Sequence, residues 1–166
     1  FKMQIFFPKE DDQEIRTTIL PEVAKKLVDL GLDVLIEEGF GNSIFIDDRF
    51  YSETGAMITS SRESALNSAD IVCRINKPPK EELSLLKKNS IHISFLDPFN
   101  EKELVSDFAK NEISAISMEL VPRITRAQKM DALSSQANLA GYAAVVEASR
   151  IINKSFPMMM TAAGTI

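Results

Sequence analysis

Residues 71–96, IVCRINKPPKEELSLLKKNSIHISFL, decide the fold class of this chain. The segment starts with the apolar run IVCRI and ends with a second one, SIHISFL, and both have the length of buried strands. The Pro-Pro dipeptide at 78–79 ends the first run, and residues 81–86 predict a helix with Leu83 and Leu86 turned inward. A strand, a helix and a strand in this order predict two parallel strands joined by a helical crossover.

The same alternation continues on both sides of this segment. Short helices are predicted at residues 50–56, 61–68 and 101–110, and further strands at residues 2–7, 32–37, 56–59 and 114–118. Strands that regularly alternate with helices are typical of α/β proteins with a parallel sheet. We therefore expect residues 1–120 to form one α/β domain with a Rossmann-like or flavodoxin-like, mainly parallel sheet, covered by helices on both faces.

One longer helix is predicted between the first two strands. Apolar residues recur at spacings of three to five residues from Ile15 to Leu30, and Gly31 follows as a terminator. Pro21 fits best in the first turn of this helix, where its missing N–H costs nothing.

Composition and charge narrow the functional class. The chain has 166 residues, of which 45% are apolar, and a formal net charge of −5. The acidic balance argues against a nucleic-acid partner, which would require a basic face. One cysteine and one histidine exclude a disulfide framework and leave almost nothing for metal ligation, so we expect no metal. Neither a membrane-spanning apolar run nor a signal peptide is found in the sequence, which favours a soluble, cytoplasmic-type protein.

The pattern changes after residue 120. From Arg126 to Ile152 it predicts one long helix, unusually rich in Ala, Ser and Gly. We expect this small-residue face to pack tightly against another element, as in a helix that bridges two domains. The tail 157–166, PMMMTAAGTI, is apolar, and we expect residues 121–166 to lead into a further domain beyond this chain.

The polar candidates for a site gather in residues 119–142, ELVPRITRAQKMDALSSQANLAGY. Arg123 and Arg126 precede the predicted helix, while three other polar residues fall at a spacing of three along one helical face: Gln128, Asp131 and Ser134. Such a set could bind a polar ligand with an amide or a phosphate. The alternative is a surface ion pair between Asp131 and Arg123, with the other side chains solvated.

Two stretches carry a family resemblance. VPRITRAQKMDALSSQANLAGY (121–142) and MMMTAAGTI (158–166) resemble the NAD-binding domain I of the proton-translocating nicotinamide nucleotide transhydrogenases. The stretches PKE (8–10), EEGFG (37–41) and IVCRINKPP (71–79) resemble the same family and its alanine dehydrogenase relatives. The resemblance covers essentially the whole chain and is most specific in residues 119–142.

The resemblance implies a function as part of an oxidoreductase. Members bind NAD(H) between two Rossmann-like subdomains and pass hydride to NADP(H) on a partner domain. A membrane domain couples this transfer to proton movement. It also implies a homodimer, located on the cytoplasmic face of a bacterial inner membrane or on the matrix face in mitochondria. No general acid or base is needed, because hydride transfer depends on positioning.

The resemblance also assigns roles to the polar residues. Arg123, Asp131 and Ser134 are expected to hold and orient the nicotinamide carboxamide, while Gln128 lies toward the NADP(H) partner. Gln128 and Asp131 are the residues expected to act in hydride transfer itself.

Three departures from the family pattern qualify this expectation. Ala143 stands where the family often has Arg after Gly-Tyr. The glycine fingerprint of dinucleotide sites would follow TAAG, beyond residue 166, so we expect the chain alone to bind NAD weakly. Gly39 and Gly41 lack the context of a phosphate site, and we expect them to form a structural turn.

Two alternatives remain open. The first is an alanine dehydrogenase-type enzyme, for which Arg16 and Lys77 match the positions that bind the keto acid. Asp97, however, stands where these relatives have His. The second is a catalytically silent fragment that docks onto a partner.

Other conspicuous residues are expected to be structural. His92 and Cys73 lie in apolar strands, where a buried histidine and a small buried hydrophobic residue are the simplest interpretations. The methionines at 158–160 are expected to fill gaps in a core.

Overall fold

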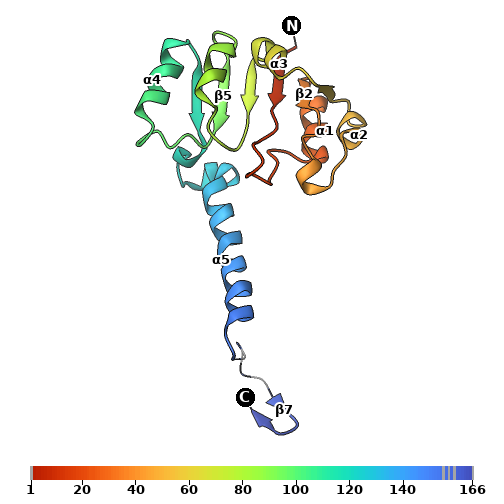
Figure 1. Cartoon of the computed structure of the whole chain (residues 1–166), viewed down its shortest axis with the longest axis vertical. Coiled ribbons are helices and arrows are strands. Elements are labelled where there is room, and N and C mark those ends of the chain that lie inside the picture. Colours follow the sequence, from red (N-terminus) through yellow and green to blue (C-terminus); the bar gives the residue numbers. More distant parts are fainter. Residues whose placement is uncertain (1, 155, 157, 159, 166) are drawn as a thin grey trace. The chain divides into compact units, whose positions relative to one another are not determined.

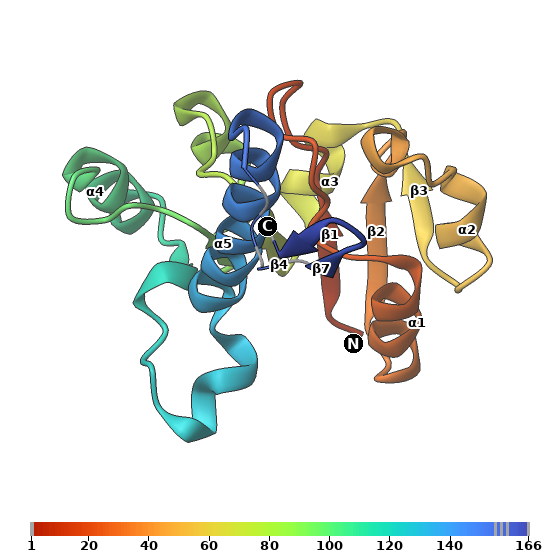
Figure 2. The same ribbon diagram turned by 90° about the horizontal axis from the view of Figure 1, so that it is seen from below.

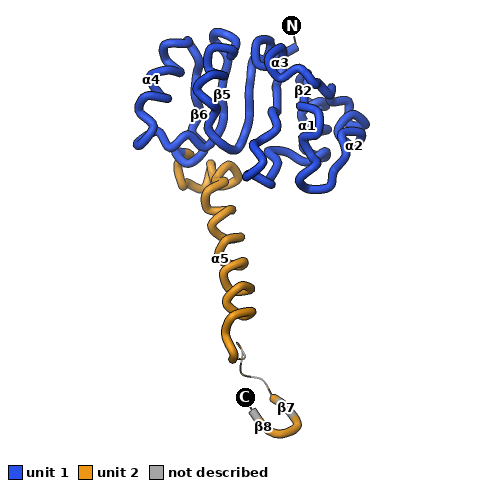
Figure 3. The backbone as a smooth tube through the Cα atoms, viewed as in Figure 1, with its two compact units in different colours: residues 1–120 blue, residues 121–166 orange. Residues whose placement is uncertain are grey.

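The computed structural model describes residues 2–154, 156, 158 and 160–165. The chain divides into two compact units, residues 1–120 and residues 121–166 (Figure 3). Unit 1 contains the large sheet with its helices, and unit 2 contains a short 3₁₀ helix, a long α-helix and a small hairpin.

The sheet of unit 1 has six strands, and every pair of neighbours is parallel. The strands are β1 (Gln4–Phe7), β2 (Asp33–Glu37), β3 (Met57–Thr59), β4 (Ile71–Cys73), β5 (Ile91–Ser94) and β6 (Ser114–Ser117). Their spatial order is β3-β2-β1-β4-β5-β6. This is the order of the Rossmann fold and not of flavodoxin, so the α/β prediction is confirmed in its Rossmann-like form.

Helices cover the sheet on two sides (Figures 1 and 2). On one face, α1 (Pro21–Asp29) and α2 (Asp48–Ser52) enclose a core with Ile5 and Phe7. On the other face, Phe6 packs against α3 (Arg62–Ser68), the 3₁₀ helix η2 (Lys80–Leu85) and α4 (Lys102–Lys110). The alternation of Ile5, Phe6 and Phe7 is what a strand buried on both faces requires.

Several predicted elements are confirmed with changed limits. The predicted helix 81–86 is a 3₁₀ helix, and Leu83 and Leu86 are buried as expected. The predicted helix 50–56 is α2, which begins earlier because the Asp47 carboxylate accepts a hydrogen bond from the backbone N–H of Arg49.

The predicted start of the first long helix is wrong. Ile15 is 68% exposed and lies in the loop between β1 and α1. Pro21 occupies the first helical position, as its missing N–H requires, and Gly31 follows the helix with a positive φ of 89°. The apolar spacing therefore extended the helix into a loop that only resembles helical periodicity.

The prediction of one continuous helix from Arg126 to Ile152 is also wrong. The structure has the 3₁₀ helix η4 (Thr125–Met130), then a break at Asp131, then α5 (Ala132–Ile151). Asp131 has φ −77° and ψ 79°, and its carboxylate accepts a hydrogen bond from the backbone N–H of Ser134 at 2.9 Å. Asp131 is therefore the N-cap residue at which a new helix starts.

The expected packing of the small-residue face is not found in the described residues. The structure describes all of α5, and none of its residues is buried. Met158 and Met160 are both 84% exposed and fill no core gap, while Met159 lies outside the described residues. Unit 2 ends in the hairpin of β7 (Met160–Thr161) and β8 (Gly164–Thr165).

The histidine and the cysteine lie on β5 and β4 as predicted. His92 is 1% exposed, its ring lies 5.2 Å from that of Phe108, and its Nε2 is 3.2 Å from Ser94 Oγ. Burial, with the nearby Arg74 charge, lowers the pKa of His92 to about 3, so the ring is neutral. Cys73 is half-buried, and burial raises the pKa of its thiol to about 12, which keeps it unreactive.

Gly39 and Gly41 form the predicted turn after β2. Gly39 has φ 74°, and its backbone N–H donates to the Asp48 carboxylate at 2.9 Å. At Gly41, a Cβ would lie 2.3 Å from the carbonyl oxygen of Ile46 and 3.0 Å from the Tyr51 ring. The backbone passes so closely here that a side chain does not fit.

We predict that Gly41→Ala destabilises unit 1, because the added Cβ meets backbone that cannot move independently. The expected cost is about 1–3 kcal/mol, as for overpacked cores. Gly141→Ala is the matched control, since a Cβ there meets nothing within 4 Å and the residue lies inside α5. Thermal unfolding followed by circular dichroism should show a lower Tm for Gly41→Ala and an unchanged or higher one for Gly141→Ala. Equal melting curves for the two variants would contradict this account of the turn.

Candidate functional site

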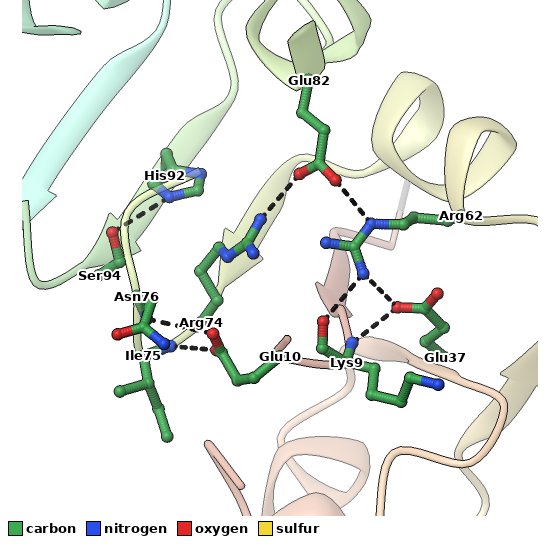
Figure 4. Close-up of polar contacts among 10 residues, drawn as sticks. All are labelled: Lys9, Glu10, Glu37, Arg62, Arg74, Ile75, Asn76, Glu82, His92 and Ser94. Carbon is green, nitrogen blue, oxygen red and sulfur yellow. Dashed lines mark hydrogen bonds and ion pairs between the residues drawn. The ribbon is translucent and has the colours of Figure 1, made fainter. Parts of the chain in front are cut away.

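The carboxyl ends of β1 and β4, where nucleotides usually bind in this fold, are occupied by the chain's own ion pairs (Figure 4). Arg62 contacts Glu37 at 2.6 Å and Glu82 at 2.7 Å. Arg74, whose side chain is 5% exposed, contacts the other oxygen of Glu82 at 2.8 Å. Four charged side chains from separate elements thus compensate one another at this point.

The loop that follows β1 also lacks the features of a phosphate site. Residues 8–20 contain no glycine, and three acidic residues follow one another at 10–12. The backbone N–H of Lys9 donates to Glu37 at 2.6 Å, and the carboxylate of Glu10 accepts from Ile75 N–H at 2.5 Å. A phosphate would meet carboxylates here rather than free amides, so this edge is not the binding site.

A pocket of 380 Å³ lies beside this edge, between residues 9–17 and residues 39–43. Arg16 lines it and is held by Glu14, with Nε 2.7 Å from the carboxylate. Lys77 is not among the residues that line this pocket, and it forms an ion pair with Glu101. The two positions that match alanine dehydrogenases are thus both neutralised by carboxylates of this chain.

Asp97, the third of those positions, also lies outside this pocket. Its backbone is left-handed, with φ 50°, and its carboxylate accepts hydrogen bonds from Asn100 Nδ2 at 3.0 Å. An aspartate in this setting supplies neither the positive charge nor the proton that an imidazolium would offer to a carboxylate substrate.

Unit 2 brings the sequence-predicted polar residues together. One pocket of 300 Å³ is lined by Arg123, Ile124, Thr125, Gln128, Asp131 and Ser134. All four residues predicted for the site line this pocket, while Arg126 does not. Ile124 and Thr125 were missed by sequence reasoning, although they lie within the same motif.

Local backbone geometry explains why these side chains converge. The 3₁₀ turns of η4 place Gln128 three residues before Asp131, at the junction with α5. The Asp131 carboxylate caps the helix at Ser134, and the Asp131 carbonyl accepts a hydrogen bond from Ser135 Oγ at 3.0 Å. The pocket is therefore built around the start of a helix.

Electrostatics make Asp131 a fixed acceptor. The Ser134 hydroxyl and then the Ser134 backbone N–H lower the pKa of Asp131, and the positive charge of Arg123 adds to this effect. The carboxylate is therefore ionised at neutral pH and would repel a phosphate. It suits a ligand group that donates an N–H, and Arg123, Gln128 and Ser134 can donate to that group's carbonyl oxygen. Together these groups match a primary amide.

Two searches of the described residues gave negative results. None of the described helices is long and apolar enough to cross a membrane. Within the same residues, no cluster of three or more His, Cys, Asp or Glu side chains could hold a metal ion.

Comparisons with known proteins support the resemblance. The first of the separate parts of NAD(P) transhydrogenase subunit alpha from Rhodospirillum rubrum is 43% identical over 170 residues, covering 99% of this chain and 44% of the relative. A crystal structure of transhydrogenase from Sinorhizobium meliloti has a TM-score of 0.88 and 41% identity, covering 98% of this chain and 49% of that one. A structure of an L-alanine dehydrogenase has a TM-score of 0.67 and 29% identity, covering 72% and 33%.

The chain thus spans less than half the length of these relatives. The family described as alanine dehydrogenase/PNT, N-terminal domain, matches residues 6–140, which is most of the chain. With this match and the transhydrogenase relatives, the chain belongs to the alanine dehydrogenase/PNT N-terminal domain family.

Proposed function

We propose that this chain is the N-terminal portion of the NAD(H)-binding component of a proton-translocating transhydrogenase. The parent protein transfers hydride from NADH to NADP⁺ and couples the transfer to proton movement across a membrane. The observation that carries the proposal is the single pocket that gathers Arg123, Gln128, Asp131 and Ser134. Its agreement with the transhydrogenase relatives supports the assignment.

The donor and acceptor set of the pocket fits the nicotinamide end of NAD(H). A carboxamide has one N–H₂ donor group and one carbonyl acceptor. Asp131 accepts from the N–H₂ group, while Arg123 and Ser134 donate to the carbonyl oxygen. When bound, NADH supplies the hydride, and the protein's role is to hold the ring in one orientation. Both lobes of the carboxamide are matched, so the ring cannot flip without losing hydrogen bonds.

Gln128 has a separate role in this proposal. Its side chain lines the same pocket but is neutral, so it can lie against a second nicotinamide without adding charge. We assign it to the side that faces NADP(H) on the partner domain. Gln128 and Asp131 together set the approach of the two rings, which is the requirement for direct hydride transfer.

The two units have different tasks in this proposal. Residues 1–120 form a Rossmann-like scaffold that binds no nucleotide at its own sheet edge. Residues 121–166 carry the nicotinamide pocket and the helix that leads into a second, dinucleotide-binding domain. That domain would bind the adenosine and the pyrophosphate. The partners are the NADP(H)-binding domain and the membrane proton-channel domain, and the parent forms a homodimer on the cytoplasmic or matrix face of the membrane.

The two alternatives receive less support from the site. Alanine dehydrogenase activity is disfavoured by Asp97 and by the pairing of Lys77 with Glu101. A silent docking fragment would not require four ligand-type side chains in one pocket.

Asp131 offers a test that separates ligand binding from helix capping. Asn is as good an N-cap as Asp, so Asp131→Asn should leave thermal stability nearly unchanged. It removes the charge and one acceptor, and we expect the Kd of the parent protein for NADH to rise about tenfold, as for the loss of a charge-assisted hydrogen bond. Asp131→Ala should raise the Kd equally and also lower the Tm. Titration followed by NADH fluorescence or calorimetry measures the first effect, and full binding by Asp131→Asn would refute the assigned role.

The division of labour between the units predicts that the 166-residue chain alone binds NADH weakly. It would contact the carboxamide but not the pyrophosphate or the adenosine, so most of the binding free energy is absent. Calorimetry should show no heat at micromolar NADH, whereas the parent protein should bind. Micromolar binding by the chain alone would contradict the assignment of the remaining contacts to a second domain.

The alanine dehydrogenase alternative has its own measurement. We expect the parent protein to show no reductive amination of pyruvate with NADH and ammonium, because Asp97 cannot act as the imidazolium of those enzymes. Absorbance of NADH at increasing pyruvate concentration checks this, with NADP⁺-analogue reduction as the positive control. Steady, pyruvate-dependent NADH consumption would reverse the order of the two functions.

A further inference from the structure

Glu119 connects two segments that are distant in the sequence. It lies in the 3₁₀ helix η3 (Met118–Leu120), directly after β6. Its carboxylate accepts hydrogen bonds from the backbone N–H of Leu96 at 3.0 Å and of Asp97 at 2.5 Å. Both amides belong to the loop that follows β5. Glu119 therefore ties the exit of one strand to the exit of its neighbour.

The loop that Glu119 binds has a conformation that needs such support. Asp97 has φ 50°, which a residue with a side chain rarely adopts. Its carbonyl oxygen accepts from the backbone N–H of Asn100 at 3.0 Å and of Glu101 at 2.9 Å. The two consecutive amides before this bend point to one place, and the Glu119 carboxylate fills it.

The charge state of Glu119 matches this task. Partial burial favours the neutral acid, but hydrogen bonds to the carboxylate, including those from Asp97 and Leu96, outweigh it and lower the pKa. The group is therefore ionised at neutral pH, and charge-assisted hydrogen bonds of this kind are stronger than neutral ones.

Glu119 also stands immediately before the segment that carries the pocket. Arg123 follows it by four residues, which span at most about 14 Å when fully extended. Unit 2 begins at residue 121, so η3 is the last turn of unit 1. A shift of this turn is passed to Arg123 with little chain in between to absorb it.

We propose that Glu119 is a positioning residue for dinucleotide binding: by holding the loop after β5, it fixes the turn from which the segment of Arg123 and Asp131 starts. The inference rests on the function proposed above and adds a residue that does not line the pocket. Glu119 touches neither ring in this scheme. Its effect is to raise the fraction of molecules in which the pocket residues stand in their binding arrangement.

The test uses the full-length protein and three variants. Glu119→Ala removes both hydrogen bonds, while Glu119→Gln keeps one acceptor oxygen. Glu103→Ala is the control, because Glu103 is an exposed glutamate on α4 that pairs with Lys80. If the binding arrangement falls to roughly a tenth to a third of the molecules, the Kd for NADH rises about threefold to tenfold. We expect this for Glu119→Ala, a smaller rise for Glu119→Gln and none for Glu103→Ala.

Hydrogen exchange and thermal unfolding complete the design. The amides of Leu96 and Asp97 should exchange faster in Glu119→Ala than in Glu119→Gln, in the same order as the Kd values. A purely structural residue would lower the Tm without moving the Kd, and that result would overturn the inference. If Asp131→Ala weakens NADH binding and Glu119→Ala does not, only this inference fails. If the unaltered protein does not bind NADH, the proposed function fails with it.

Discussion

Backbone amides at the carboxyl edge of the sheet are bound by the chain's own carboxylates, and this constraint shapes the whole of unit 1. Each parallel strand ends with N–H groups that need a partner, and such groups are the usual anion sites of α/β proteins. Here the partners are acidic side chains. The pairs are Lys9 N–H with Glu37, Gly39 N–H with Asp48, Ile75 N–H with Glu10, and Leu96 N–H with Glu119. Four loops at one edge are thus closed by the same device.

This device moves ligand binding away from the place where the topology would put it. The strand order is that of a dinucleotide-binding fold, but the amides that would bind phosphate are occupied and Glu82 and Glu37 add charge beside them. In unit 2, Asp131 binds an amide in the same way, at Ser134, but there the carboxylate also lines a pocket with Arg123. The same interaction closes an edge in one unit and presents an acceptor in the other.

How far the sequence predicts this structure depends on the range of each interaction. The strands and the two-sided core follow from apolar runs, and the four polar residues follow from one continuous motif. The start of α1 was misplaced because Ile15 continues an apolar spacing without being helical. The helix break was missed because periodicity does not show that the Asp131 side chain caps a helix. Glu119 was missed because its partners are 22 and 23 residues away, with no local signal of the contact.

The composition of α5 indicates what surrounds the pocket in the parent protein. Leu133, Leu139, Tyr142, Val145 and Val146 are all exposed. At about 100° per residue they spread over more than half of the helix circumference. Because most helical stability comes from tertiary packing, a helix with apolar residues on so many sides is built to be enclosed rather than to rest on one surface. Enclosing it would also narrow the solvent access of the pocket at its N-terminus. Hydrogen bonds to a carboxamide would then form in a drier environment, where they hold the ring more firmly.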